Sequence, residues 1–151
     1  MKTYLRHRIL NVVDVKELFA LEYLDFEGKY KDYSEKHNFF EMCFVLDGEI
    51  TLNLDGDASI ISRGELILIE PNTEHSYFSS NGNRNCAFVV CFECPSIAVR
   101  SLAGRKFSLT RDQEYFFDKI IKESAGTFWT NEKDLLELLP TLILAVSRSL
   151  F

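Results

Sequence analysis

The stretch Phe39–Ser62, which reads FFEMCFVLDGEITLNLDGDASIIS, decides the fold class. Phe39–Leu46 is apolar at almost every position, and Glu49–Leu54 alternates apolar with polar residues, as a strand with one buried face does. Asp47-Gly48 and Asp55-Gly56 separate the strand-like segments. Asp-Gly is typical of two-residue hairpin turns, because such turns need a positive φ at both central residues. The stretch therefore predicts a three-stranded antiparallel meander.

Segments with strand character continue on both sides of this meander. The pattern predicts strands downstream over Glu65–Glu70, His75–Ser79 and Cys86–Glu93 and, with a weaker signal, upstream over Val12–Val15 and Leu21–Phe26. The polar segment Lys29–Lys36 is expected to be a loop. Many short strands at close spacing are typical of a β-sandwich or a small barrel.

The hydrophobic period changes from two to about 3.6 residues near Thr110, which predicts helices. Thr110 and Gln113 form a capping box before a helix that is expected to stop near Gly126. A second helix is expected from about Asn131, with a kink or break at Pro140, because proline removes a backbone hydrogen bond. We therefore divide the chain into a β-barrel over residues 1–109 and a helical tail over residues 110–151.

The second helix of the tail carries more apolar surface than packing on one side of a barrel needs. One part is expected to pack on the outer face of the barrel, against Met42 or Phe44. The rest of the apolar surface of this helix is expected to form the interface, or seam, of a homodimer. The predicted seam includes four residues: Leu135, Leu139, Leu142 and Val146.

Composition and charge exclude several classes of partner. The chain has 151 residues and a formal net charge of −6, without a cluster of Lys and Arg, so it is expected to bind DNA poorly by itself. The segment Met1–Leu10 is charged and unlike a secretory signal, and no window has the roughly 18 apolar residues of a membrane span. We therefore expect a cytoplasmic protein with no membrane partner. Its four cysteines are expected to be free thiols, because the cytoplasm is reducing. Cys91-x-x-Cys94 lacks the second pair of cysteines that a zinc site needs, so Cys91 is expected to be a core thiol.

The apolar strand around Phe39–Leu46 also carries polar residues on one face. Alternation places five residues on that face, namely His37, Phe39, Glu41, Cys43 and Val45, and four on the other, namely Phe40, Met42, Phe44 and Leu46. A strand that is apolar on both faces is covered on both sides. A buried carboxylate is costly unless it is paired, so Glu41 is expected to meet a polar ligand or an imidazole such as that of His75.

Two spacings resemble known motifs. Glu35-x-His37-x3-Glu41-x6-Gly48 resembles the first cupin motif, with Glu35 at the first histidine position, and Gly64-x10-His75 resembles the second, with Pro71 displaced by one residue. The runs H-x-F-x-E-x-x-F-V-L-x-G and R-G-E-L-I-L-I-E-P-N-T-E-H-S-Y are similar to the N-terminal domain of AraC-type transcription regulators. This resemblance covers about residues 4–150.

The resemblance implies a mainly β, cupin-like barrel (a double-stranded β-helix or jelly roll) followed by two C-terminal helices. It implies a sensor rather than an enzyme, in which a small effector, often a sugar or another polar metabolite, binds inside the barrel without a metal or other cofactor. The tail helices would pair two subunits, and a separate helix-turn-helix domain outside this chain would bind DNA. The expected effector-binding residues are Glu35, His37, Phe39, Glu41, His75 and Tyr77.

Two alternatives remain open from the sequence. The first is a metal-dependent cupin enzyme, such as an isomerase or a dioxygenase, with Glu35, His37, Glu41 and His75 as the metal ligands. The second is a plain dimerisation module whose barrel is filled by its own side chains, which the 13 phenylalanines would permit.

Overall fold

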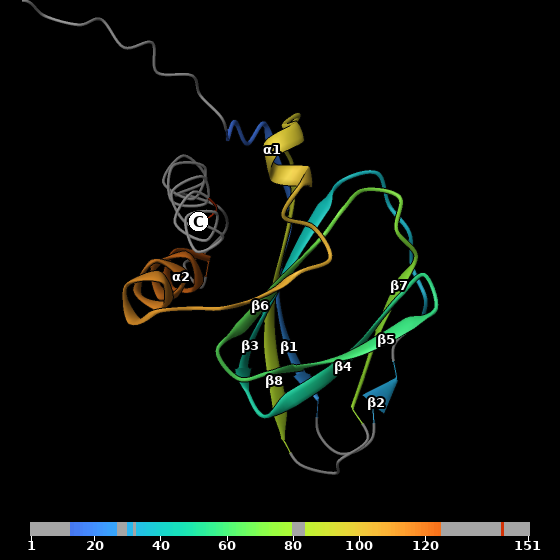
Figure 1. The fold of residues 1–151 in the computed structure, drawn as a ribbon. Coiled ribbons are helices and arrows are strands. Elements are labelled where there is room, and N and C mark those ends of the chain that lie inside the picture. Colours follow the sequence, from blue (N-terminus) through green and yellow to red (C-terminus); the bar gives the residue numbers. More distant parts are fainter. Residues whose placement is uncertain (1–12, 27–29, 32, 80–83, 125–142, 144–151) are drawn as a thin grey trace, which may run out of the picture.

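The computed structural model describes residues 13–26, 30–31, 33–79, 84–124 and 143. Two antiparallel sheets face each other in this part of the chain (Figure 1). The first has the order β1-β8-β3-β6-β9, with β1 (Glu17–Phe26), β8 (Asn85–Glu93), β3 (Phe40–Asp47), β6 (Glu65–Ile69) and β9 (Lys106–Ser108). The second has the order β2-β7-β4-β5, with β2 (Tyr30–Lys31), β7 (His75–Ser79), β4 (Glu49–Leu54) and β5 (Asp57–Ser62). Among the residues described up to Ser124, β8 is followed by the helices α1 (Ile97–Arg100) and α2 (Arg111–Ser124).

The strands predicted between Phe39 and Glu93 are confirmed, each within one residue of its expected bounds. The prediction of a strand over Val12–Val15 is wrong for its described residues. Val13 and Val15 lie outside any strand, although both are buried, because their side chains pack into the core as the chain approaches β1. The segment predicted as a loop over Lys29–Lys36 contains the short strand β2, which pairs with β7.

The predicted three-stranded meander is also wrong, because β3 does not pair with β4. Strand β3 has β6 on one edge and β8 on the other, so neither edge is free for β4. At Asp47-Gly48 the chain crosses to the second sheet, where β4 pairs with β5 and β7. Only Asp55-Gly56 makes the expected hairpin, with φ of 47° and 93°.

The crossover at Gly48 depends on a contact with residues far away in the sequence. Gly48 has a φ of 69°, and a Cβ atom there would overlap the side chain of Asn85 and lie 2.9 Å from the carbonyl oxygen of Arg84. The Asn85 side-chain oxygen accepts a hydrogen bond of 3.0 Å from the backbone N–H of Glu49. Asn85 thus holds the start of β4 against β8.

We expect Gly48→Ala to lower the free energy of unfolding by about 2–3 kcal/mol. About 1–2 kcal/mol would come from the left-handed backbone and about 1 kcal/mol from the displaced hydrogen bond of Asn85. Gly56→Ala is a matched control, because its φ is 93° but no atom lies within 4 Å of the added Cβ. Urea unfolding of both variants measures the difference. Equal losses would contradict a close-packed crossover at Gly48.

The two faces of β3 separate two hydrophobic cores, as the alternation predicts. The inner core lies between the sheets and includes Cys43 and Val45. The outer core covers the other face of the first sheet and includes Met42 and Phe44. Helix α2 lies against this outer face, on the side away from β4, β5 and β7 (Figure 1).

The helix predicted after Thr110 is confirmed as α2, and so is its capping box. The Gln113 side-chain oxygen accepts a 2.8 Å bond from the Thr110 N–H, and the Thr110 hydroxyl accepts a 3.3 Å bond from the Gln113 N–H. The predicted second helix lies outside the described residues except for Ile143, which is helical and buried in the outer core. The predicted dimer residues Leu135, Leu139, Leu142 and Val146 also lie outside them. In the part of the chain that the structure describes, no helix is long and apolar enough to cross a membrane.

Candidate ligand site at the barrel mouth

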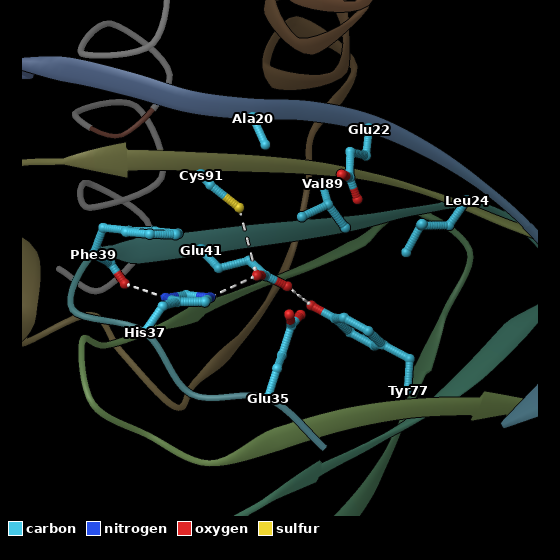
Figure 2. Close-up of a pocket in the computed structure, with 10 residues that line it drawn as sticks. All are labelled: Ala20, Glu22, Leu24, Glu35, His37, Phe39, Glu41, Tyr77, Val89 and Cys91. Carbon is cyan, nitrogen blue, oxygen red and sulfur yellow. Dashed lines mark hydrogen bonds and ion pairs between the residues drawn. The ribbon is translucent and has the colours of Figure 1, made fainter. Parts of the chain in front are cut away.

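A cavity of about 200 Å³ opens between the two sheets (Figure 2). Its walls come from four strands and from the segment before β3. The lining residues are Ala20, Glu22 and Leu24 of β1, Glu35, His37 and Phe39 before β3, Glu41 of β3, Tyr77 of β7, and Val89 and Cys91 of β8. The segment before β3 is held to β7 by a reciprocal pair of backbone hydrogen bonds between Glu35 and His75, each 2.9 Å.

The structure brings together all six residues that the sequence singles out as effector-binding. Five line the cavity, and His75 lies beside Glu41 with only 1% of its surface exposed. The sequence pattern does not indicate the contribution of β1, whose inward-facing row adds the carboxylate of Glu22. Cys91 is buried as predicted, but it also lines the cavity.

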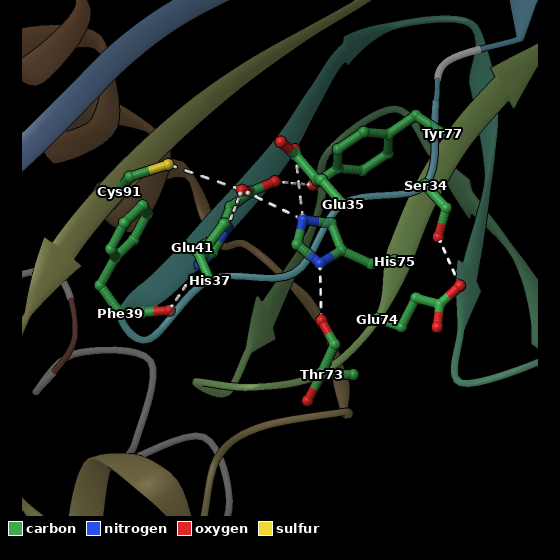
Figure 3. Close-up of polar contacts among 10 residues, drawn as sticks. All are labelled: Ser34, Glu35, His37, Phe39, Glu41, Thr73, Glu74, His75, Tyr77 and Cys91. Carbon is green, nitrogen blue, oxygen red and sulfur yellow. Dashed lines mark hydrogen bonds and ion pairs between the residues drawn. The ribbon is translucent and has the colours of Figure 1, made fainter.

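Both imidazole rings are held by backbone carbonyl groups. Nδ1 of His37 lies 3.0 Å from the carbonyl oxygen of Phe39, and Nδ1 of His75 lies 2.9 Å from that of Thr73 (Figure 3). A carbonyl oxygen only accepts hydrogen bonds, so each Nδ1 carries the hydrogen. The Nε2 atom of each ring therefore faces the cavity side, as an acceptor when the ring is neutral.

The Nε2 atoms meet carboxylates. Nε2 of His37 is 3.1 Å from Oε2 of Glu41. Nε2 of His75 is 3.3 Å from the same oxygen and 3.4 Å from Oε1 of Glu35. His75 Nε2 is buried, and neither of its contacts has the geometry of a hydrogen bond. Lone pairs facing one another at these distances repel, so the cluster needs positive charge from protons on the rings or from a bound cation.

The remaining contacts of Glu41 come from neutral donors. The Tyr77 hydroxyl donates to Oε1 of Glu41, and the Cys91 thiol donates to Oε2 at 3.5 Å. Burial raises the pKa of the Tyr77 hydroxyl and of the Cys91 thiol, and the charge of Glu41 raises both further. Both groups therefore keep their protons at neutral pH and stabilise Glu41 as a carboxylate.

An aromatic stack fixes the position of His37. Its ring lies on Phe39 with centroids 3.9 Å apart and planes 7° from parallel, and Phe39 stacks on Phe19 at 4.4 Å. Phe19 is 45% exposed, so the stack reaches from solvent to the cavity. Phe39 therefore holds the ring of His37 by two contacts. Its ring stacks on the face of the imidazole, and its carbonyl oxygen accepts the hydrogen bond of Nδ1.

The charges in this cluster predict a mildly acidic optimum of stability in the metal-free protein. Burial alone would raise the pKa of Glu41, but His75, Tyr77 and His37 outweigh it and lower the pKa from 4.5 to about 2. The stability that ionised Glu41 contributes to the fold is therefore present above pH 4.5 and is lost as the pH falls towards 2. Burial alone would lower the pKa of His75, but Glu41 and the Thr73 carbonyl outweigh it and raise the pKa above 6.5. The stability that protonated His75 contributes to the fold is therefore present below pH 6.5 and is lost as the pH rises through the raised pKa of His75.

We therefore expect the melting temperature to be highest between pH 4.5 and 6.5 and to fall at higher pH. Calorimetry across this range, with a chelator present, measures it. A melting temperature that keeps rising well above pH 6.5 would contradict the charge assignment of His75.

The cluster also fits a divalent metal ion. One ligand atom from each of Glu35, His37, Glu41 and His75 lies within 4.8 Å of the others. Histidine ligands commonly donate the other ring N–H to a carbonyl or carboxylate, as both do here. The orphaned Nε2 of His75 is the atom that such an ion would bind.

Comparisons with known proteins find one matching family model and several similar solved structures. Residues 25–92 match the family model of the cupin domain, whereas no curated protein sequence matches the chain. Similar solved structures include a conserved protein of unknown function, SPY1581, from Streptococcus pyogenes (11% identity, 48% of this chain, 62% of that chain, TM-score 0.44). They also include the CENP-C cupin domain of Drosophila melanogaster (18% identity, 47% of this chain, 59% of that chain, TM-score 0.43). A third is a predicted oxalate decarboxylase from Thermotoga maritima (19% identity, 51% of this chain, 67% of that chain, TM-score 0.45). The match thus spans less than two thirds of the first two of these chains. Residues 25–92 thus match a cupin domain, and the fold of the chain is the mainly β cupin fold that its two motifs predict.

Proposed function

We propose that this chain is the effector-sensing domain of an AraC-type transcription regulator, with a small polar metabolite bound in the barrel mouth. The observation that carries the proposal is the cavity lined by Glu35, His37, Glu41 and Tyr77. Its polar groups are already oriented by hydrogen bonds to one another and to the backbone, as expected of a preformed binding site. The motif resemblance supplies the regulator class.

Strand β3 offers a route from the cavity to the helical tail. Glu41 points into the cavity, whereas Phe44, three residues later, points to the outer core. The ring of Phe44 contacts that of Phe117 in α2, with centroids 4.6 Å apart. A ligand that favours one position of β3 would therefore favour one position of α2. In the proposed regulator, the tail forms the homodimer, and a separate domain binds DNA.

Ligand-dependent stabilisation tests this proposal. A panel of neutral sugars, small amines and small carboxylates would be screened for an increase in melting temperature. We expect at least one class to stabilise the protein, and His37→Ala to abolish the effect. Lys36→Ala is the control, since Lys36 is the exposed neighbour of His37. If no class stabilised the protein, or if both variants responded like the parent, the sensor proposal would be wrong.

A metal-dependent cupin enzyme is the second candidate. The orphaned Nε2 of His75 and the carbonyl-bound Nδ1 atoms specifically favour it. His37, His75, Glu41 and Glu35 would hold the ion, which would act as a Lewis acid towards an oxygen-containing substrate. Phe39 would keep His37 in place, and Tyr77 would hold Glu41.

Elemental analysis separates this candidate from the sensor. The protein would be purified without a metal-affinity tag and then equilibrated with zinc or manganese. The enzyme candidate predicts about one ion per chain in the parent and loss of that ion in His37→Ala. A chain that holds no ion after equilibration would eliminate the candidate.

A further inference from the structure

We infer that the ligand of this cavity is a small organic cation, an ammonium group on a short apolar chain. The inference rests on the proposed ligand-binding function and names the chemical class of the ligand. It replaces the sugar that the motif resemblance favours.

The charge of the cavity favours a cation. Three carboxylates line it, those of Glu22, Glu35 and Glu41, and no Lys or Arg is among the ten lining residues. The imidazoles of His37 and His75 are the opposing groups at the site. Even with both rings protonated, three negative charges face two positive ones, so an anionic ligand would be repelled.

The hydrogen-bonding capacity of the cavity also favours a donor-rich ligand. Carboxylate oxygens only accept hydrogen bonds. The donors of Tyr77 and Cys91 are already directed at Glu41. A sugar hydroxyl needs acceptors and donors, whereas an ammonium group has three donors and no acceptor. The lining therefore matches an ammonium group better than a sugar.

One buried atom points to the place of the ammonium group. Nε2 of His75 has no hydrogen-bond partner, and the side chain is fully buried. It lies 3.3 Å from Glu41 and 3.4 Å from Glu35. An N–H donor beside these atoms would satisfy the ring nitrogen and both carboxylates at once.

The apolar lining residues of the cavity account for the apolar chain of the proposed ligand. Ala20 and Leu24 of β1 and Val89 of β8 are apolar lining residues (Figure 2). A cavity of about 200 Å³ has room for about six or seven groups the size of a water molecule. A short alkyl chain fits this space, whereas a bare metal ion would leave the apolar wall unused.

Three molecules of one chain length test the inference: n-butylammonium chloride, n-butanol and sodium butyrate. Binding to the metal-free full chain would be measured by calorimetric titration at matched ionic strength. We expect butylammonium to bind and the neutral and anionic analogues not to bind. Glu22→Gln should weaken butylammonium binding about fivefold, because Glu22 is exposed and exposed ion pairs contribute modestly. Glu17→Gln, an exposed carboxylate on the same strand, should leave it unchanged.

The outcomes separate this inference from the proposed function. Binding of a sugar or of butyrate, without butylammonium, would overturn the organic cation and leave the sensor proposal intact. Binding of zinc alone would overturn it in favour of the metal site. Butylammonium binding that is equally strong in Glu22→Gln and in the parent would place the ligand elsewhere and would also overturn it. If no compound of any class bound, both the inference and the sensor proposal would fall.

Discussion

Glu41→Gln is expected to lower the free energy of unfolding by about 3–5 kcal/mol, the usual cost of removing one partner from a buried charged cluster. Glu41 is 2% exposed and contacts His37, His75, Tyr77 and Cys91. An amide in its place has one oxygen acceptor instead of two and turns an N–H₂ group towards donors. The two imidazoles would also lose their counter-charge, and His75 is too deeply buried for water to replace it.

Chemical denaturation of the variant measures this loss. Glu93→Gln is the control, because Glu93 is an exposed carboxylate at the end of β8. The control should differ from the parent by less than about 0.5 kcal/mol. The variant should also lose the decline in stability above pH 6.5, because Glu41 is the main group that raises the pKa of His75. If Glu41→Gln were as stable as Glu93→Gln, the polar cluster would not be a structural unit.

Phe117→Ala is expected to cost about 3–5 kcal/mol, as large-to-small changes at buried aromatic residues do. Phe117 is fully buried in the outer core. Its ring lies 4.6 Å from that of Phe44 and 5.9 Å from that of Phe88, so it joins α2 to two neighbouring strands. The cavity left behind would be lined by both strands.

Tyr115→Ala is the matched control on the same helix. Tyr115 is 58% exposed, and its main contacts are with Phe116 and Lys119 on its own helix. Thermal unfolding should show a loss of at most about 1 kcal/mol for this variant. Similar losses in the two variants would show that α2 is not part of the outer core, and the route from β3 to the tail would then have no basis.

Hydrophobic alternation predicts the strands well, but it does not predict how they pair. Asp47-Gly48 and Asp55-Gly56 have the same sequence, yet the second closes a hairpin and the first carries the chain to the other sheet. The difference lies in distant residues. Strand β3 is flanked by β6 and β8, and Asn85 packs against Gly48. Single-sequence turn rules contain none of these tertiary contacts.

The candidate site also has residues that the sequence predicts and one, Glu22, that it does not. The spacing of His37 and Glu41 and the second motif ending at His75 bring these side chains together, because they lie on or beside strands that face each other. The position of Glu22 follows from the register of β1 against β8, where Glu22 pairs with Val89. That register joins residues at least 59 positions apart in the sequence, from Phe26 with Asn85 to Glu17 with Glu93, so no local pattern identifies Glu22 as a lining residue.

The helical tail is predictable where a local signal exists. The capping box at Thr110 fixes the start of α2, and the structure has both of its hydrogen bonds. The dimer seam around Leu139 and the division into residues 1–109 and 110–151 remain predictions.

The protonation of His75 tests the central claim that the barrel mouth is a preformed site whose carboxylates need a positive charge, from a ring proton or from a bound cation. Long-range ¹H–¹⁵N NMR of the imidazole nitrogens, in the metal-free protein at pH 5.5, reads it directly. We predict a hydrogen on Nδ1, directed at the Thr73 carbonyl, and a second on Nε2 that is displaced when butylammonium or zinc is added. A neutral ring with its only hydrogen on Nε2, unchanged by either cation, would contradict the account.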